Sequence, residues 1–150
     1  MVKKESVNNF LTGSKFAVAG VSRSGKKFGN SAYKELKKRG YTVYPVNPNI
    51  NEINGDKCFG NLTELKDKVD GVVVVVPPDE SVKVIKDAES AGIKNVWLQQ
   101  GAESDEAIEY CADKGINVVY GQCILMFAGQ AEFFHRTHKW VRGITGRLPK

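Results

Sequence analysis

A short stretch of small, basic and amide side chains, GVSRSGKKFGN at residues 20–30, suits the binding of phosphate. An apolar run precedes the stretch, and a helical pattern of apolar residues follows it. A strand that leads through a glycine-containing loop into a helix presents backbone N–H groups and the positive end of the helix dipole to an anion. Arg23, Lys26 and Lys27 add positive charge, and Asn30 adds an amide donor. We therefore expect this loop to bind a phosphate group.

The loop nearly matches two nucleotide-binding motifs and departs from both. It fits GxxxxGK from Gly20 to Lys26, but Lys27 follows where a P-loop needs a Ser or Thr hydroxyl for Mg²⁺. Pro77 stands after the later valine run, where an aspartate would hold the same ion. Read as GxGxxG, the loop has Ser22 in place of the second glycine. The sequence therefore disfavours nucleotide hydrolysis and fits the dinucleotide motif poorly.

The end of the second expected strand is uncharged and consists of Val46, Asn47 and Pro48. A protein that binds NAD usually carries Asp or Glu there to hold the ribose, and one that binds NADP can carry Arg. Neither type is present at this position. An NAD(P)-binding oxidoreductase or a nucleotide-sensing domain is therefore the alternative interpretation and not the favoured one.

The segments around the loop show the periodicities of strands and helices. The run GVVVVV at residues 71–76 does not alternate apolar and polar residues, which indicates a strand buried on both faces of a parallel sheet. Phe28, Ala32 and Leu36 lie at helical spacing, and we expect them to face the core. Asn61 or Thr63 and, further along, Asp79 are candidate helix caps.

Strands and helices alternate along the chain. The expected strands are residues 15–20, 41–48, 71–76, 95–99 and 116–120. The expected helices are residues 28–39, 62–68, 79–91 and 104–114. This order predicts an α/β fold, a Rossmann-like, doubly wound open sheet of about five parallel strands. Such sheets bind ligands beyond the carboxyl ends of their strands, where the basic loop is expected to lie.

The chain is predicted to form one domain over residues 1–150, with a core at about 11–126 and a C-terminal tail. Residues 131–142 have the pattern of an amphipathic helix, which we expect to pack on the sheet as an extra C-terminal helix. A contact with a second copy, a protein partner or a membrane surface is the alternative, and it would make the chain an interaction module. His135 and His138 fall in this tail, and we interpret them as solvated residues and not as metal ligands.

The composition is that of a globular chain with a preference for anions. Hydrophobic residues make up 41% and charged residues 26%, and the net charge of +5 favours an anionic partner. No apolar run is long enough to span a membrane, and the first ten residues lack the apolar segment of a secretion signal. The three cysteines are widely spaced and odd in number, which disfavours a zinc site and a disulfide framework. We expect a cytoplasmic protein.

Four stretches along the chain carry a more specific signal. They are VAGVSRSGKKFGNSAYKELKKRGYTVYPVNP, the valine strand ending in VPP, VWLQQGAES and GINVVYGQCILM. In this order they resemble the stand-alone CoA-binding domain family, which is related to the CoA-binding domain of the succinyl-CoA synthetase alpha subunit, over about residues 11–126. The resemblance implies a protein whose small-molecule ligand is coenzyme A (CoA) or an acyl-CoA. We expect neither a membrane nor a nucleic acid as its partner.

The resemblance also implies how the phosphates of the ligand would be held. Gly20, Val21 and Ser22 would approach the diphosphate of CoA. Lys27 and Asn30, at the start of the following helix, match positions that contact phosphate. Arg23 and Lys26 are further candidates, because they lie on the same basic loop.

The adenosine end would lie at the second strand, according to the same resemblance. Val46, Asn47 and Pro48 would flank it, and their lack of charge suits the 3′-phosphate of CoA, which a carboxylate would repel. Val76, Pro77 and Pro78 would line the other side, and Ser81 would donate from the following helix. Gln99 and Gly101, at the end of the fourth expected strand, would either contact the ligand or belong to a solvated loop.

Cys123 is the one candidate nucleophile, since it follows the fifth strand and the family pattern also carries a cysteine there. No His or other base lies near it in the sequence to activate the thiol. We therefore interpret Cys123 as a small buried residue and expect binding without catalysis.

Overall fold

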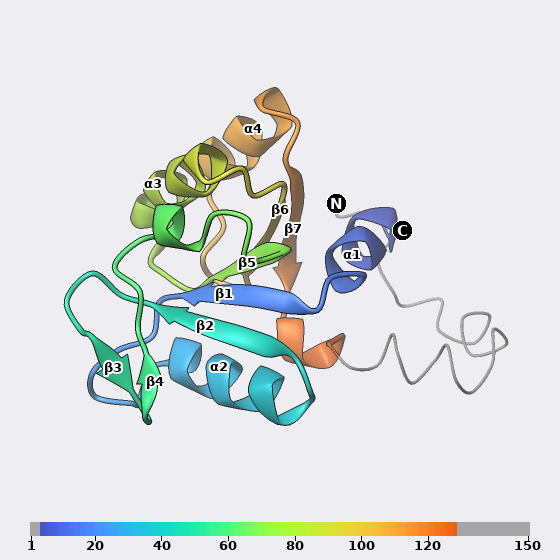
Figure 1. Ribbon diagram of the computed structural model, residues 1–150. Coiled ribbons are helices and arrows are strands. Elements are labelled where there is room, and N and C mark those ends of the chain that lie inside the picture. The colour runs from blue at the N-terminus through green and yellow to red at the C-terminus, as the bar shows by residue number, and fades with distance from the viewer. Residues whose placement is uncertain (1–3, 129–150) are drawn as a thin grey trace, which may run out of the picture.

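A computed structural model describes residues 4–128 of the chain. Its centre is a five-stranded sheet in the order β2-β1-β5-β6-β7, in which all neighbouring strands are parallel (Figure 1). The strands are β1 (Lys15–Ala19), β2 (Thr42–Val46), β5 (Gly71–Val74), β6 (Asn95–Gln99) and β7 (Asn117–Gln122). The strand order reverses between β1 and β5, so this pair marks the switch point where such sheets bind ligands. The predicted doubly wound α/β fold is confirmed.

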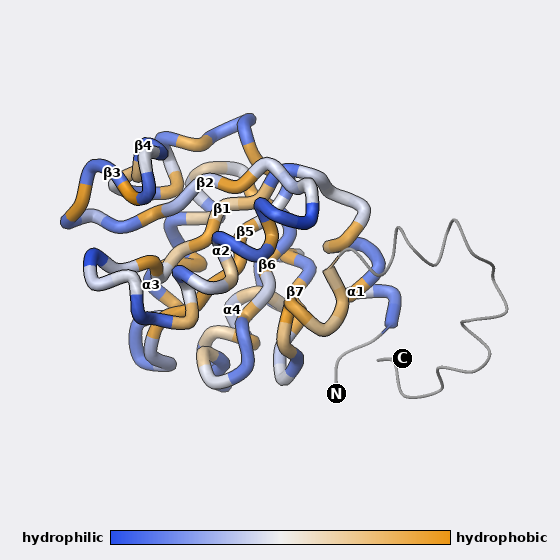
Figure 2. The backbone as a smooth tube through the Cα atoms, turned by 90° about the horizontal axis from the view of Figure 1, so that it is seen from below, coloured by the Kyte–Doolittle hydropathy of each residue, from blue (hydrophilic) through white to orange (hydrophobic). Residues whose placement is uncertain are grey.

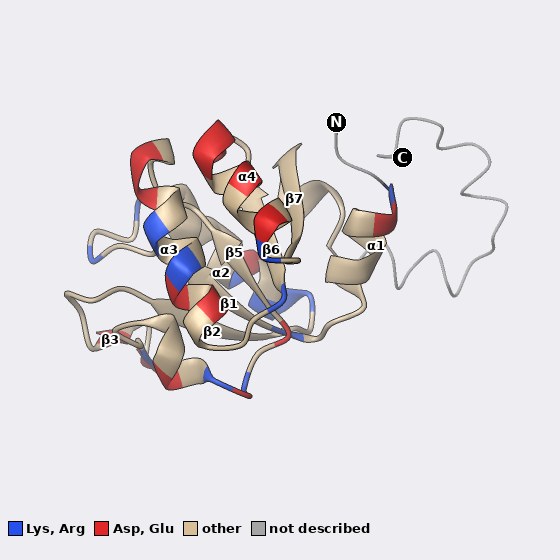
Figure 3. Ribbon diagram, turned by 90° about the horizontal axis from the view of Figure 1, so that it is seen from above, with Lys and Arg blue, Asp and Glu red and all other residues tan. Residues whose placement is uncertain are grey.

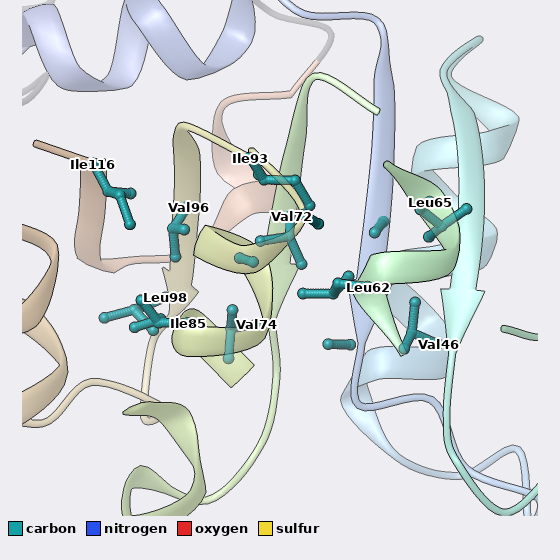
Figure 4. Packing of buried hydrophobic residues seen from close by; sticks show 14 of the residues in the cluster. Val46, Leu62, Leu65, Val72, Val74, Ile85, Ile93, Val96, Leu98 and Ile116 are labelled. Atoms are coloured by element: carbon teal, nitrogen blue, oxygen red, sulfur yellow. The ribbon is translucent and has the colours of Figure 1, made fainter. Parts of the chain in front are cut away.

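Both faces of the sheet are covered, because the strands carry apolar side chains on each side. All four residues of β5 are buried. Val72 and Val74 belong to the core cluster under α3 (Pro78–Ser90) and α4 (Asp105–Asp113), with Ile85 packed beside them (Figure 4). Val73 points to the opposite face, into the cluster beneath α2 (Phe28–Lys38). The backbone coloured by hydropathy is mostly orange or pale along the central strands, and most of its blue segments lie at the periphery (Figure 2).

Helix α1 (Lys4–Leu11) was not expected from the sequence. Its buried residues Val7 and Phe10 lie three apart on one face, with the half-buried Leu11 beside Phe10, and its other residues are polar. The Phe10 ring stacks on Phe16 of β1, with ring centroids 4.7 Å apart, and meets the edge of Trp97 of β6 at 5.3 Å. The helix therefore closes the α2 face of the sheet beside β6 and β7.

The start of α3 differs from the prediction. Pro77 occupies the N-cap position and makes no side-chain cap hydrogen bond, so the expectation that Asp79 caps this helix is wrong. Pro78 opens the helix, where its fixed φ angle suits the first turn. Asp79 lies inside that turn. Of the two candidates Asn61 and Thr63, Asn61 is the cap, and it accepts a hydrogen bond from the Glu64 N–H. Ser104, expected as the first residue of a helix, is the N-cap of α4 and accepts from the Ala107 N–H.

A two-stranded hairpin follows β2, between the second and third strands expected from the sequence. It consists of β3 (Glu52–Ile53) and β4 (Asp56–Lys57), and the turn between them has left-handed φ angles at Asn54 (51°) and Gly55 (85°). The Lys37 ammonium of α2 contacts the Asp56 carboxylate at 2.5 Å and ties the hairpin to the helix. Two short 3-10 helices complete the described chain, η1 (Leu62–Leu65) and η2 (Ile124–Met126); the first is shorter than the helix expected at 62–68.

The predicted tail helix at residues 131–142, with His135 and His138, lies outside the described residues. Among residues 4–128, no helix is long and apolar enough to cross a membrane.

Candidate functional site: a basic loop at the carboxyl ends of the strands

The basic loop packs against two other backbone segments without any intervening side chain. Gly20 has a φ of 128°, and a Cβ atom there would lie 2.0 Å from the Val75 carbonyl oxygen. A Cβ atom on Gly29, in the first turn of α2, would lie 2.4 Å from the Gly20 carbonyl oxygen. These glycines are therefore required by close approach, and they hold the loop after β1 directly against the N-terminus of α2.

Asn30 fixes the conformation of this loop. Its side chain is fully buried, and its amide oxygen accepts hydrogen bonds from the Ser22 N–H at 2.9 Å and the Ser22 hydroxyl at 3.2 Å. Its amide nitrogen donates to the Ser22 carbonyl at 3.0 Å. The Asn30 amide, which the sequence suggested as a donor to phosphate, thus makes its hydrogen bonds within the loop itself. The reason is the close approach of α2, which brings Asn30 under Ser22 and away from solvent.

The N-terminus of α2 is electrostatically distinct from those of the other helices that follow strands. The first turn of α3 carries Asp79 and Glu80, and that of α4 carries Asp105 and Glu106, visible as red segments at the ends of these helices (Figure 3). The first turn of α2 carries no acidic residue. Because acidic side chains already occupy the positive ends of α3 and α4, an anion at this edge of the sheet is favoured at α2.

The cations expected at the site surround this helix end. Arg23, Lys26 and Lys27 are all exposed. Lys27 is the N-cap residue of α2, and its backbone is extended with φ −78° and ψ 156°. Phe28, which the helical pattern assigned to the core, is 40% exposed, whereas Gly29 and Asn30 of the same turn are buried. The loop therefore presents positive charge and one aromatic ring to solvent.

The loops after β1 and β2 are tied together. Asn47 donates from its amide nitrogen to the Val21 carbonyl at 2.8 Å and accepts from the Asn49 N–H at 2.7 Å. Arg23 reaches across from the first loop and donates to the Asn49 carbonyl at 2.8 Å. The sequence has no arginine at the end of β2, but the fold brings Arg23 there from β1. Sequence reasoning missed this placement, because Arg23 and Asn49 are 26 positions apart.

The residues expected on the other side of the site divide into surface and buried groups. Val76 is half-buried, and Pro77, Pro78 and Gly101 are exposed at the sheet edge. Ser81 is fully buried, and its hydroxyl donates to the Ala102 carbonyl instead of facing a ligand. The Gln99 amide oxygen accepts from the Ile124 N–H at 3.0 Å, which anchors η2 to the end of β6.

The three thiols differ in environment. Burial raises the pKa of the Cys111 thiol to about 12. Burial also raises the pKa of Cys58, although a hydrogen bond to the Asn47 backbone acts in the opposite direction. Cys123 is half-buried and opens η2 after β7. Within residues 4–128 no cluster of three or more His, Cys, Asp or Glu side chains has the arrangement to hold a metal ion.

A groove of about 420 Å³ lies between α2 and the turn of the β3–β4 hairpin. It is lined by Tyr33, Lys34, Lys37, Lys38 and Asn54, and it shares no residue with the site expected from the sequence. We place the candidate site at the strand ends and not in this groove, because the loop combines the helix N-terminus, the close-packed glycines and the cations.

Comparison with known proteins gives consistent matches. The family model described as CoA binding domain matches residues 14–128. An ADP-forming acetate–CoA ligase I from Archaeoglobus fulgidus is 32% identical over 120 residues, which are 73% of this chain and 18% of the ligase. The uncharacterized protein YneT of Bacillus subtilis is 30% identical over 122 residues, 81% of this chain and 90% of YneT.

Solved structures agree with these matches. A conserved hypothetical protein from Pyrococcus furiosus superposes with a TM-score of 0.72 at 42% identity, covering 75% of this chain and 97% of that one. The chain spans only 18% and 12% of the first two ligases that it matches, from Archaeoglobus fulgidus and Methanocaldococcus jannaschii. In contrast, it spans nearly the whole of the two uncharacterized proteins.

Proposed function

Because the chain belongs to the CoA binding domain family, we propose that it binds coenzyme A or an acyl-CoA at the carboxyl ends of β1, β2 and β5. The observation that carries this proposal is the N-terminus of α2, which lacks acidic residues and is flanked by Lys26 and Lys27. It lies at the switch point of the sheet, where doubly wound folds bind ligands that contain diphosphate.

The described residues have distinct parts in this proposal. The backbone from Gly20 to Ser22 and the first turn of α2 receive the diphosphate, with Lys27 as a point charge. Asn30 holds the loop in position through Ser22. Pro48 on one side and Val76 and Pro77 on the other offer apolar surface to the adenosine, whereas Val46, which was expected beside it, is buried in the core. Residues 41–51 contain no Asp or Glu, so no carboxylate in that segment opposes a ribose phosphate.

We further propose that the chain by itself binds its ligand without catalysis, in the cytoplasm. The acetate–CoA ligases that it matches are much longer proteins, of which it spans a minor part. Two of the thiols have a raised pKa, so they are mostly protonated and weakly nucleophilic at neutral pH. The test is incubation with acetyl-CoA and succinyl-CoA, with and without ATP and Mg²⁺, while free thiol is measured. Release above the uncatalysed rate, abolished by Cys123→Ser, would show an enzyme.

The ligand itself is identified by mass spectrometry of what the purified protein releases on denaturation. We expect CoA or an acyl-CoA in the released fraction. NAD or NADP in its place would support the alternative, an NAD(P)-binding oxidoreductase or nucleotide-sensing domain. This alternative has one structural observation in its favour, because Arg23 at the end of β2 is also placed to meet the 2′-phosphate of NADP.

A further inference from the structure

The side chain of Arg23 is directed to the end of β2 by contacts on both sides. Its neighbour Ser22 is fixed by three hydrogen bonds to Asn30. Its partner Asn49 is fixed by a hydrogen bond to the Asn47 amide oxygen at 2.7 Å. Arg23 therefore spans two loops that are each held in place, and its guanidinium lies where the second strand ends.

The other two cations of the loop lie elsewhere. The Gly25 N–H donates to the Ser22 carbonyl at 3.2 Å, so the chain turns back between these residues. Arg23 lies before Gly25 in this turn and contacts the loop after β2. Lys27 lies after Gly25 and is the N-cap of α2. The turn thus separates one cation at the β2 end from another at the helix end.

The charge of Arg23 is not neutralised by its surroundings. Its hydrogen bond goes to a neutral backbone carbonyl, which uses one of the five N–H donors of a guanidinium. No carboxylate within residues 4–128 lies at ion-pair distance from it, since the ion pairs there involve other residues. A planar group with free donors and an unpaired charge is suited to bind a phosphate monoester through two hydrogen bonds.

We propose that Arg23 binds the phosphate monoester on the adenosine ribose of CoA and thereby makes the protein prefer CoA to dephospho-CoA. This inference rests on the proposed function, and it adds the residue that determines specificity. Lys27 and the N-terminus of α2 serve the diphosphate, which both ligands share. Arg23 serves the 3′-phosphate, which only CoA has.

The test is calorimetric titration of the full chain and its Arg23→Gln variant with CoA and with dephospho-CoA. The wild-type chain should bind CoA more tightly by about 10- to 100-fold, the range expected for a hydrogen-bonded charge pair. Arg23→Gln should bring this ratio close to one, because it should lower the affinity for CoA far more than the affinity for dephospho-CoA. Arg23→Lys, which keeps the charge and loses the two-pronged geometry, should give an intermediate ratio. Lys34→Gln is the charge-matched control, because Lys34 is exposed on α2 away from the loop, and its ratio should equal that of the wild type.

Each other outcome overturns the inference in a distinguishable way. If both ligands bind and the ratio survives Arg23→Gln, Arg23 does not recognise the phosphate and the proposed function stands. If the wild-type chain binds both ligands with the same affinity, the site does not recognise the 3′-phosphate. Titrations with NADPH and NADH complete the set. Binding of NADPH that is lost in Arg23→Gln, without binding of CoA, would overturn both the inference and the proposed function.

Discussion

The substitution Gly29→Ala has two opposing effects on stability, and the structure indicates which of them is larger. Replacing a glycine by alanine inside a helix usually stabilises a protein by about 0.5–1 kcal/mol. Here the added Cβ atom would lie 2.4 Å from the Gly20 carbonyl oxygen, and real contacts of this kind rarely fall below 3.0–3.4 Å. The loop and helix must therefore separate by about 0.6–1.0 Å, which is the difference between these distances.

We expect the strain at Gly29 to exceed the gain in helix propensity. Forcing extra atoms into packed regions costs about 1–3 kcal/mol, so the free energy of unfolding should fall by roughly 1–2 kcal/mol. The same displacement moves Ser22 away from the N-terminus of α2, so the affinity for CoA should fall about tenfold or more. Urea denaturation measures the first effect, and calorimetric titration measures the second.

Gly60→Ala is the matched control for this substitution. A Cβ atom on Gly60 would meet only the end of the flexible Glu64 side chain, at 3.0 Å. We expect little change in stability and none in CoA affinity. A Gly29→Ala protein that is as stable as the wild type and binds CoA equally well would refute the argument that the close approach of loop and helix builds the site.

Three further substitutions test separate parts of the account. Lys27→Ala should lower CoA affinity by about one to two orders of magnitude, because a charge-assisted hydrogen bond is worth roughly 1.5–3 kcal/mol. Lys34→Ala is the control and should leave the affinity unchanged. If Lys27→Ala binds CoA as tightly as the wild type in titration, Lys27 is only a solvated charge. Asn30→Ala leaves the Ser22 backbone groups without their partner, so the free energy of unfolding measured with urea should fall by about 1–3 kcal/mol and CoA should bind more weakly. Unchanged stability would contradict the role of Asn30 in holding the loop. The pKa of Cys111 is raised from 9.0 to about 12, so the folded state keeps a proton that the unfolded state loses, and stability should fall by about 1.4 kcal/mol per pH unit as pH rises from 9 toward 12. In Cys111→Ala, the free energy of unfolding should fall less steeply with pH over the same range, by that amount. Identical slopes in the two proteins would contradict the raised pKa of Cys111.

The sheet was predictable because its signals are local. The unbroken valine run of β5 indicated burial on both faces, and all four residues of the strand are buried. The cap at Asn61 and the helix that begins after Ser104 also follow from neighbouring residues. Helix α1 was missed because Val7 and Phe10 form a short apolar face, which is stabilised by contact with Phe16 and Trp97 from distant strands.

The positions of the site residues were easier to predict than the directions of their side chains. The pattern identified Asn30 and Ser81 as polar groups near the strand ends, but both side chains are buried and bond to the protein itself. Arg23 was expected on the phosphate loop, and its contact with Asn49 depends on how two loops pack in space. Whether a polar side chain turns inward or outward is decided by such packing, which residue spacing does not encode.

The central claim, that the basic loop at the end of β1 binds CoA, is tested most directly by isothermal titration calorimetry of the purified chain. The protein is freed of carried-over ligand and titrated in parallel with CoA, NADH and NADPH. We expect saturable binding of one CoA per chain, weakened by added salt because part of the attraction is Coulombic, and no comparable binding of either dinucleotide. Tight binding of NADH or NADPH with no heat from CoA would contradict it.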